Sequence, residues 1–118
     1  MKKSDLRIAD YLDHMLEAIG RIERYTRGMT SDAFAADSLV QDAAIRNLEI
    51  IGEAAQRGTP SRELRGEACS VPWEDMYLMR NRISHGYFSV DPAVVWQTIV
   101  RDLPVLKEQI ARIREQTP

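Results

Sequence analysis

Apolar residues recur at steps of mostly three and four along nearly the whole chain, which is the spacing of a helix face. The first run predicts a helix that ends at Gly28. A second run follows Ser38, which with Gln41 resembles a capping box, and it ends at Gly58. The two predicted buried faces consist of Leu6, Tyr11, Met15, Ile19, Ile22 and Tyr25, then Ala44, Leu48, Ile51 and Ala55.

Turn and capping residues divide the rest of the chain. Thr30, Ser31 and Asp32 offer caps for a short helix around Ala33 to Ala36. The segment from Thr59 to Ser70 holds proline, glycine and mixed charges, so we interpret it as a connector. Pro72 fits the first turn of a third helix, which Gly86 should stop. Residues of that helix available for burial are Trp73, Met76, Tyr77 and Ile83.

The C-terminal quarter predicts a fourth helix with a kink. Asp91 followed by Pro92 is a cap and a first-turn proline, which together start a helix. Pro104 lies inside this helix and should kink or restart it, with Asp102 as a local cap. The predicted buried positions are Val95, Ile99, Leu103, Leu106, Ile110 and Ile113.

These patterns predict an all-α, up-down bundle of four main helices that forms one domain over residues 1–118. The only strand-like run is Tyr87 to Val90, and it lies between two predicted helices. Apolar faces this long, on a chain this short, exceed what one monomer buries. We therefore expect a dimer.

Composition narrows the class of protein. The chain is 44% hydrophobic and 29% charged, with a net charge of −2, which argues against coating nucleic acid by bulk charge. The N-terminus has no signal-peptide pattern, and no apolar run is long enough to span a membrane. Cys69 is the only cysteine, which fits a reducing compartment. We expect a cytoplasmic protein.

Candidate chemistry is concentrated in residues 80–87, which read Arg-Asn-Arg-Ile-Ser-His-Gly-Tyr. Arg80 offers a planar fork of donors suited to phosphate, and His85 titrates nearest neutral pH. Metal-independent phosphodiester cleavage requires these two kinds of group, one to stabilise charge and one to move protons. An arginine and a histidine five residues apart are a weak signal alone, so Asn81, Gly86 and Tyr87 supply the specificity.

The residues alone leave the role of His85 open. On a continuous helix, residues five apart point about 140° away from each other, so Arg80 and His85 converge only if the helix frays before Gly86. His85 in that position also suits a cap on the C-terminal carbonyls. The other histidine, His14, lies in the middle of the first predicted helix. No metal-ligand set is recognisable, and no cofactor is expected. Cleavage needs an acid as well as a base, which favours a composite site from two chains.

Several blocks of the sequence resemble the HepT-like group of HEPN-domain proteins. Arg80, Asn81, His85 and Tyr87 match that group's R-x4-H-x-Y signature. Further blocks appear in the family's order, and coverage runs from about Leu6 to Ile113. These blocks are Asn47 to Ala55, Pro72-Trp73, Met79 to Asn81, His85 to Phe88 and Asp102 to Pro104.

The resemblance implies a dimeric helical bundle with a metal-independent ribonuclease site in the dimer cleft. It implies Arg80 and His85 as catalytic residues, Asn81 as a polar helper, and a 2′,3′-cyclic phosphate product. Arg82 is a candidate RNA contact. It further implies the toxin of a type II or VII toxin–antitoxin pair, neutralised when an MntA-like nucleotidyltransferase antitoxin transfers AMP to Tyr87. The alternative is a non-catalytic helical partner of a minimal nucleotidyltransferase, which binds nucleotide or presents a substrate.

Overall fold

The computed structural model describes residues 3–57, 76 and 91–117, and this part of the chain is helical with no strand. The elements are α1 (Lys3–Thr26), α2 (Ser31–Ala35), α3 (Ser38–Arg57), α6 (Pro92–Gln97), the π-helix η3 (Thr98–Asp102) and α7 (Leu103–Gln116). The all-α prediction is confirmed. No helix in these described ranges is long and apolar enough to cross a membrane.

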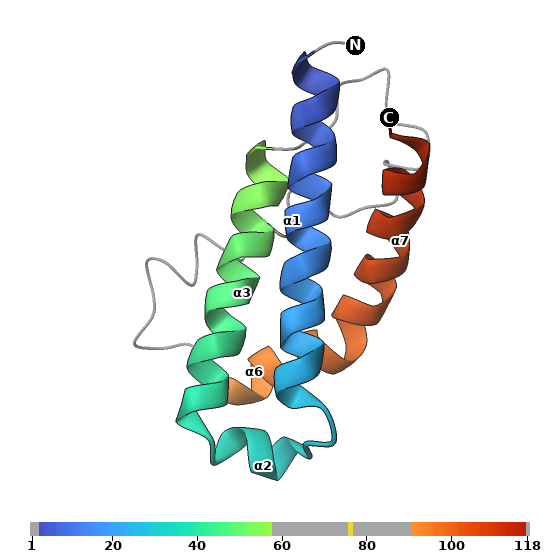
Figure 1. Ribbon diagram of the computed structural model, residues 1–118. Helices are drawn as coiled ribbons and strands as arrows, with labels where there is room; N and C mark the ends of the chain where they lie inside the picture. The colour runs from blue at the N-terminus through green and yellow to red at the C-terminus, as the bar shows by residue number, and fades with distance from the viewer. Residues whose placement is uncertain (1–2, 58–75, 77–90, 118) are drawn as a thin grey trace.

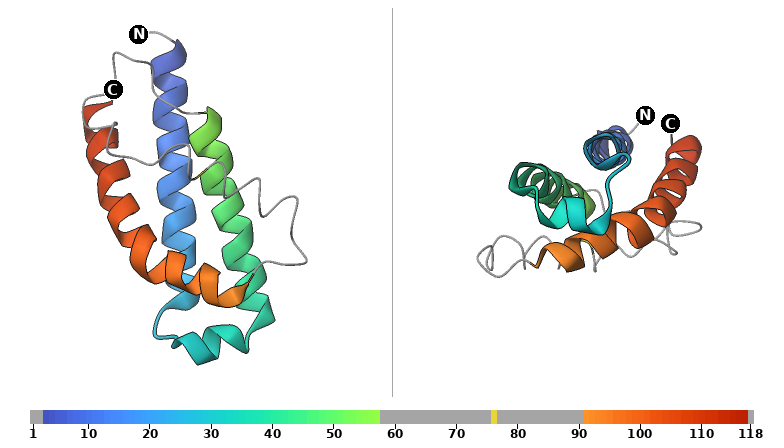
Figure 2. Two further views of the ribbon diagram at one scale, coloured as in Figure 1. Left: turned by 180° about the vertical axis from the view of Figure 1, so that it is seen from behind. Right: turned by 90° about the horizontal axis from the view of Figure 1, so that it is seen from below.

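The long helix α1 lies between α3 on one side and α7 on the other (Figure 1). The short α2 joins α1 to α3 at one end of the bundle, and α6 packs against α2 there. Figure 2 shows that α6, η3 and α7 form one curved segment that crosses the end of the bundle and then runs beside α1. Both termini lie at the opposite end from α2.

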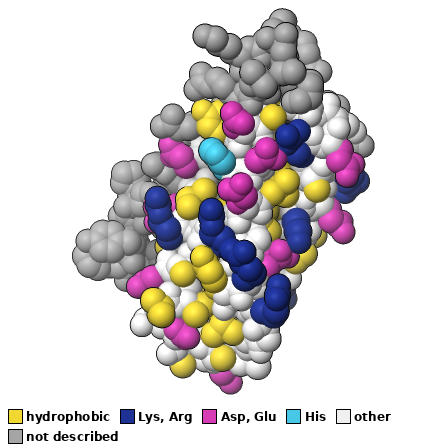
Figure 3. All heavy atoms as spheres, in the orientation of Figure 1, with side chains coloured by type: hydrophobic (Ala, Val, Ile, Leu, Met, Phe, Trp, Pro, Cys, Tyr) yellow, Lys and Arg dark blue, Asp and Glu magenta, His cyan; other side chains and the backbone are white. Residues whose placement is uncertain are grey.

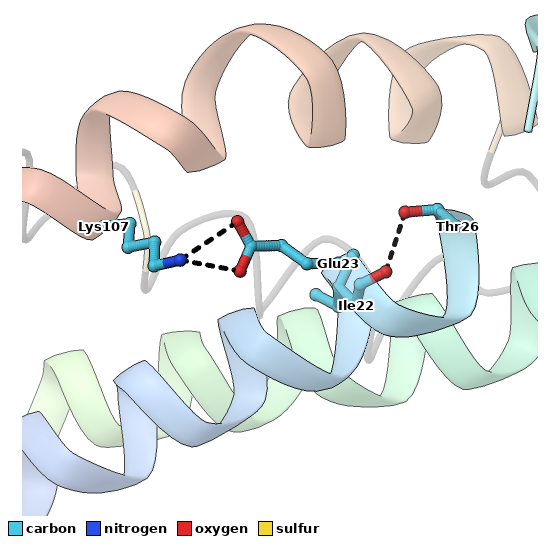
Figure 4. A network of polar contacts seen from close by, with 4 residues as sticks. All are labelled: Ile22, Glu23, Thr26 and Lys107. Atoms are coloured by element: carbon cyan, nitrogen blue, oxygen red, sulfur yellow. Dashed lines mark hydrogen bonds and ion pairs between the residues drawn. The ribbon is translucent and has the colours of Figure 1, made fainter. Parts of the chain in front are cut away.

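The turn between α1 and α2 follows the predicted local chemistry. Gly28 follows the end of α1 with φ of 76°, a left-handed conformation that glycine adopts without the steric cost of a Cβ atom. The Thr26 hydroxyl donates to the carbonyl of Ile22, one turn earlier in the same helix, at 2.7 Å (Figure 4). Thr30 is the N-cap of α2, and its hydroxyl accepts from the Ala33 amide at 3.1 Å.

The predicted capping box at the start of α3 is wrong. The cap is Asp37, whose Oδ1 accepts from the Val40 amide at 3.1 Å. The Gln41 side chain donates instead to the carbonyls of Phe34 and Ala35 at 2.7 and 3.0 Å. The short α2 leaves those carbonyls within reach, so Gln41 ties α3 to the end of α2 rather than closing a box with Ser38.

The described side chains of the predicted helix faces form the core, except for two tyrosines of α1, of which Tyr11 is partly buried and packs against the core. Met15, Ile19 and Ile22 of α1 are fully buried, but Tyr25 is 40% exposed and lies at the edge of that face. All four predicted positions of α3 and all six of the C-terminal segment are buried. Met76 is also buried in this core. Phe34 of α2 closes the end of the bundle against Trp96, with ring centroids 5.2 Å apart.

The C-terminal helix bends without restarting. The Asp91 carboxylate accepts from the Ala93 amide at 2.9 Å, which confirms the predicted cap of α6. In a regular helix the ring of Pro104 would clash with the carbonyl four residues earlier. The wider η3 turn relieves that clash, and the Leu103 amide donates to the Thr98 carbonyl. The predicted cap at Asp102 is wrong, because its side chain makes no capping hydrogen bond.

Two ion pairs connect α7 to α1 across the bundle. Lys107 Nζ lies 2.9 and 3.3 Å from the carboxylate oxygens of Glu23 (Figure 4), and Arg114 Nε lies 2.7 Å from Asp13 Oδ1. The hydrogen bond to Asp13 raises the pKa of Arg114 above its ordinary value. Both pairs are partly exposed to solvent, so they fix the register of α7 more than they stabilise the fold.

Candidate functional site

The predicted catalytic residues lie outside the described residues. Arg80, Asn81, Arg82, His85 and Tyr87 all fall within 77–90, so their relative positions stay predictions. The same holds for most of the predicted third helix. Its one described residue, Met76, is helical and 5% exposed, as a core position of that helix should be.

Two described points bracket the motif in the sequence. Met76 precedes it and packs in the core, and Asp91 follows it and caps α6. Neither residue carries reactive chemistry. Their burial and hydrogen bonding hold the chain on both sides of the segment that contains Arg80 and His85.

A groove with mixed chemistry lies between α1 and α3, with a volume of about 300 Å³. Tyr11 and His14 of α1 line it, and their rings meet edge to face with centroids 6.4 Å apart. From α3 the lining includes Arg46, Glu49, Ile50 and Glu53. These positions follow from antiparallel packing, because α1 and α3 each place residues three and four apart on the face next to the partner helix.

The groove brings His14 together with charged residues that sequence reasoning did not group with it. His14 and Arg46 are exposed, and Glu49 and Glu53 are half-buried. The signal in the sequence is a spacing of three or four residues, between positions 11 and 14 on one helix and among positions 46, 49 and 53 on the next. It identifies this set only if the two helices are assumed to pair antiparallel. A set of one arginine, one histidine and two carboxylates occurs on solvated polar surfaces as well as in binding sites. The groove alone therefore defines no reaction.

Asn47 shows why one family-like block is structural. It is 5% exposed, and its amide donates to the Ala43 carbonyl at 2.8 Å while its oxygen accepts from Arg21 at 3.4 Å. A buried amide left without partners would destabilise the fold, so these contacts hold α1 and α3 in register. Leu48, Ile51 and Ala55 of the same block are core residues. The block from Asn47 to Ala55 thus builds the scaffold.

No group of three or more His, Cys, Asp or Glu side chains among the described residues is placed to hold a metal ion. Taken together, the fold is a small helical bundle, and its sequence carries a short Arg-Asn and His-Gly-Tyr motif between two helical segments. The fold therefore places the chain in the class of small helical-bundle proteins, and its candidate chemistry is the motif segment.

Comparison with known proteins assigns the chain within that class. The family described as "Ribonuclease HepT-like" matches residues 15–113. The chain is 41% identical over 108 residues to "Probable ribonuclease HepT" of Thermococcus cleftensis, which covers 90% of this chain and 94% of that protein. The chain belongs to the HepT-like ribonuclease family.

Two further relatives extend this comparison. A Methanocaldococcus jannaschii protein named "Gamma-glutamylcyclotransferase and putative RNase" is 40% identical over 114 residues, which is 97% of this chain but only 50% of that protein. The chain thus spans about half of that relative's length. A "Putative RNase" of Caldanaerobacter subterraneus subsp. tengcongensis is 33% identical over 106 residues, covering 90% and 93% of the two chains. No solved structure matches the chain.

Proposed function

We propose that this chain is a metal-independent endoribonuclease and the toxin of a toxin–antitoxin pair. The observation that carries the proposal is the complete R-x4-H-x-Y motif, Arg80 to Tyr87, in a chain that belongs to the HepT-like ribonuclease family. The relatives named as RNases support the same class of reaction.

The proposed reaction is attack by the ribose 2′-oxygen on the adjacent phosphorus. A histidine takes the 2′-hydroxyl proton as the new P–O bond forms, and the bond from phosphorus to the 5′-oxygen breaks. A second proton goes to that leaving oxygen, so the products are a 2′,3′-cyclic phosphate and a 5′-hydroxyl. Arg80 stabilises the charge on the phosphorus oxygens, and Asn81 assists as a neutral donor.

The requirement for both a base and an acid favours a two-fold homodimer. Each chain has one histidine in the motif, His85, so a site shared by two chains would contain two histidines and two Arg80 side chains. In this arrangement one His85 acts as the base and the other as the acid. Arg82, two residues after Arg80 in the sequence, is the proposed contact to neighbouring RNA phosphates.

Product analysis in the presence of a chelator tests the reaction. Purified protein incubated with RNA and excess EDTA should still cut it and leave 2′,3′-cyclic phosphate ends. Such an end joins to a 5′-phosphate only after the cyclic phosphate is opened and the phosphate is removed, which distinguishes it from a 3′-hydroxyl end. Loss of cleavage in EDTA that is recovered with Mg²⁺, or 5′-phosphate products, would refute the metal-independent mechanism.

The proposed regulation is AMP transfer to Tyr87 by an MntA-like nucleotidyltransferase. The Tyr87 oxygen attacks the α-phosphorus of ATP, pyrophosphate leaves, and the phenol proton is lost to solvent. Tyr87 is two residues from His85, so the adduct adds bulk and a negative charge next to the motif. Its phosphate would pair with Arg80 and occupy the place of the substrate phosphate.

Mass spectrometry after incubation with the partner enzyme and ATP tests this regulation. We expect an increment of about 329 Da, the mass of a transferred AMP, on the peptide that contains Tyr87, together with loss of RNA cleavage. Tyr87→Phe should accept no AMP and escape neutralisation. Tyr25→Phe is the matched control because Tyr25 is an exposed tyrosine of α1. AMP on another residue, or neutralisation of Tyr87→Phe, would exclude the proposed regulation.

The same two assays separate the proposal from its alternative. A chain that accepts AMP at Tyr87 but cuts no RNA before modification would be a non-catalytic partner of the nucleotidyltransferase. Cleavage by the unmodified protein, lost on modification, is the result expected of a toxin.

A further inference from the structure

Four arginines lie close together on the side of the bundle where α1 runs between α3 and α7. Arg21 and Arg24 are three residues apart on α1, so their side chains are neighbours on its surface, and Arg27 follows directly after the helix. Arg46 lies on α3 next to Asn47, whose side-chain oxygen accepts a hydrogen bond from Arg21. Figure 3 shows basic side chains in an oblique row across this side. The surface that we call the arginine band consists of Arg21, Arg24, Arg27 and Arg46.

Three of these four arginines carry charge that the described part of the chain does not neutralise. Arg24, Arg27 and Arg46 are exposed to solvent and make no hydrogen bond or ion pair there. Glu23, the acidic residue next to Arg24 in the sequence, pairs with Lys107 of α7 at 2.9 Å. The band therefore concentrates positive charge, although the chain as a whole has a net charge of −2.

The stability of the helices accounts for only part of the band. Arg24 lies in the last turn of α1, where a cation interacts favourably with the helix dipole. Arg46 lies in the middle of α3, where the dipole has little effect. It forms no ion pair with Asp42, four residues earlier, or with Glu49, three residues later. Neither the dipole nor an ion pair explains a cation at this position near Arg21, and like charges that are neighbours destabilise a fold.

An exposed aromatic ring accompanies the band. Tyr25 is 40% exposed and lies four residues after Arg21, which is about one turn along the same face of α1. Aromatic rings beside cations are the arrangement that binds single-stranded nucleic acids, because bases stack on the rings while phosphates pair with the cations. An acidic protein surface would use the charges but not the ring. The combination therefore favours RNA over a protein partner.

We propose that the arginine band is a docking surface for the single-stranded RNA that this chain cuts. Its guanidinium groups bind phosphates, and the ring of Tyr25 stacks on a base. The inference rests on the proposed ribonuclease function, but the band is separate in the sequence from the motif at 80–87 and contains no histidine. It is a binding surface, and cleavage remains with the motif.

The chemistry of arginine determines what this surface recognises. A guanidinium fork donates two parallel hydrogen bonds to one phosphate, which the point charge of lysine does not do. Contacts to phosphates carry no sequence information, so the band holds RNA of any sequence. A base reaches the ring of Tyr25 only when it is unstacked from its neighbours, which restricts the surface to single-stranded segments.

RNA binding tests this surface without cleavage. The His85→Ala protein is used so that the RNA stays intact, and its dissociation constant for a labelled single-stranded RNA of mixed sequence is measured by fluorescence anisotropy at several salt concentrations. Adding Arg24→Gln and Arg46→Gln together should raise this constant about tenfold at low salt, through the loss of two exposed ion pairs. The slope of log affinity against log salt should become shallower by about 1.4, since each lost phosphate contact contributes about 0.7.

Two sets of control variants complete the design. Arg101→Gln with Arg112→Gln removes the same charge from exposed arginines of η3 and α7 and should leave the constant and the slope near their original values. Tyr25→Ala should weaken binding at every salt concentration without changing the slope, whereas Tyr25→Phe keeps the ring and should bind like the parent protein. Circular dichroism should remain helical in all of these variants, because the substituted side chains are exposed.

Cleavage by the same variants with His85 intact separates this inference from the proposed reaction. The changes at Arg24 and Arg46 should raise KM about tenfold and leave kcat near the wild-type value, because contacts away from the reacting bond stabilise the bound substrate and the transition state equally. A protein that binds RNA through the band and cuts none would refute the ribonuclease and leave the binding surface standing.

Two results would overturn the band itself. One is RNA binding that responds no more to the changes at Arg24 and Arg46 than to those at Arg101 and Arg112. The other is a band variant that binds RNA normally but escapes neutralisation by the nucleotidyltransferase, which would make the band a surface for a protein partner.

Discussion

The two histidines of this chain lie in regions of opposite kinds. His14 lies in the described groove between α1 and α3, where Tyr11, Arg46 and two glutamates come from separate turns of two helices. His85 lies in a segment whose sequence neighbours, Arg80, Asn81 and Tyr87, are themselves reactive or polar. The neighbours of His14 are brought to it by the packing of two helices, whereas the neighbours of His85 lie next to it in the sequence.

This difference shows what each kind of signal can establish. Charged residues next to a histidine on helix surfaces arise readily, because the outer faces of a bundle are polar. The groove therefore remains a polar surface until a ligand is found. A motif that matches a family at every position is more specific, even where the geometry is not described. The assignment of function rests on the motif, and the assignment of fold rests on the helices.

Replacing each histidine with alanine in turn is the most direct test of this comparison. His85→Ala should lower RNA cleavage by about a hundredfold to ten-thousandfold, the usual contribution of a positioned proton-transfer group. His14→Ala is the matched control and should cut at the wild-type rate, measured with labelled RNA under single-turnover conditions. The opposite result would move the active site to the α1–α3 groove.

The fold could be predicted from the sequence where apolar residues recur regularly. Ile99, Leu103, Leu106 and Ile110 are buried as expected, because helical periodicity continues through the bend. Capping was harder to predict, since several residues near a helix start can accept the same amide. Asp37 caps α3 although Ser38 and Gln41 match a capping box, because Gln41 is held by carbonyls of α2. That competition is between segments and is invisible in a local pattern.

The candidate site divides in the same way. Arg80 and His85 could be selected because they are close in the sequence and belong to a recognisable signature. The grouping of His14 with Arg46 and Glu49 could not, because it depends on how two helices pair. The bend at Pro104 was predicted, but the π-turn that relieves its clash depends on backbone geometry that residue types do not specify.

A substitution in the core should lower stability, whereas the substitution of His85 should lower RNA cleavage and leave stability unchanged. Ile110 is fully buried, so Ile110→Ala should lower the free energy of unfolding by about 3 kcal/mol through lost burial and the cavity left behind. Val105→Ala on the same helix is the control, since Val105 is 56% exposed and should change stability by less than about 0.5 kcal/mol. Urea unfolding at one fixed protein concentration measures both. His85→Ala should leave this free energy near the wild-type value, which separates chemistry from fold.

The smallest expected change in stability distinguishes two aspartates, Asp91 just before α6 and Asp102 at the end of η3. Asp91 accepts a hydrogen bond from the Ala93 amide, so Asp91→Ala should lower the free energy of unfolding by about 1 kcal/mol. Asp102 makes no capping bond and is exposed, so Asp102→Ala should stay within about 0.5 kcal/mol of the wild type. The same urea measurement applies. Because Asp91 also follows the motif in the sequence, a loss of RNA cleavage in Asp91→Ala that exceeds its loss of stability would show that the start of α6 holds the catalytic segment in place. Equal losses in the two variants would mean instead that capping at Asp91 contributes nothing special to this helix.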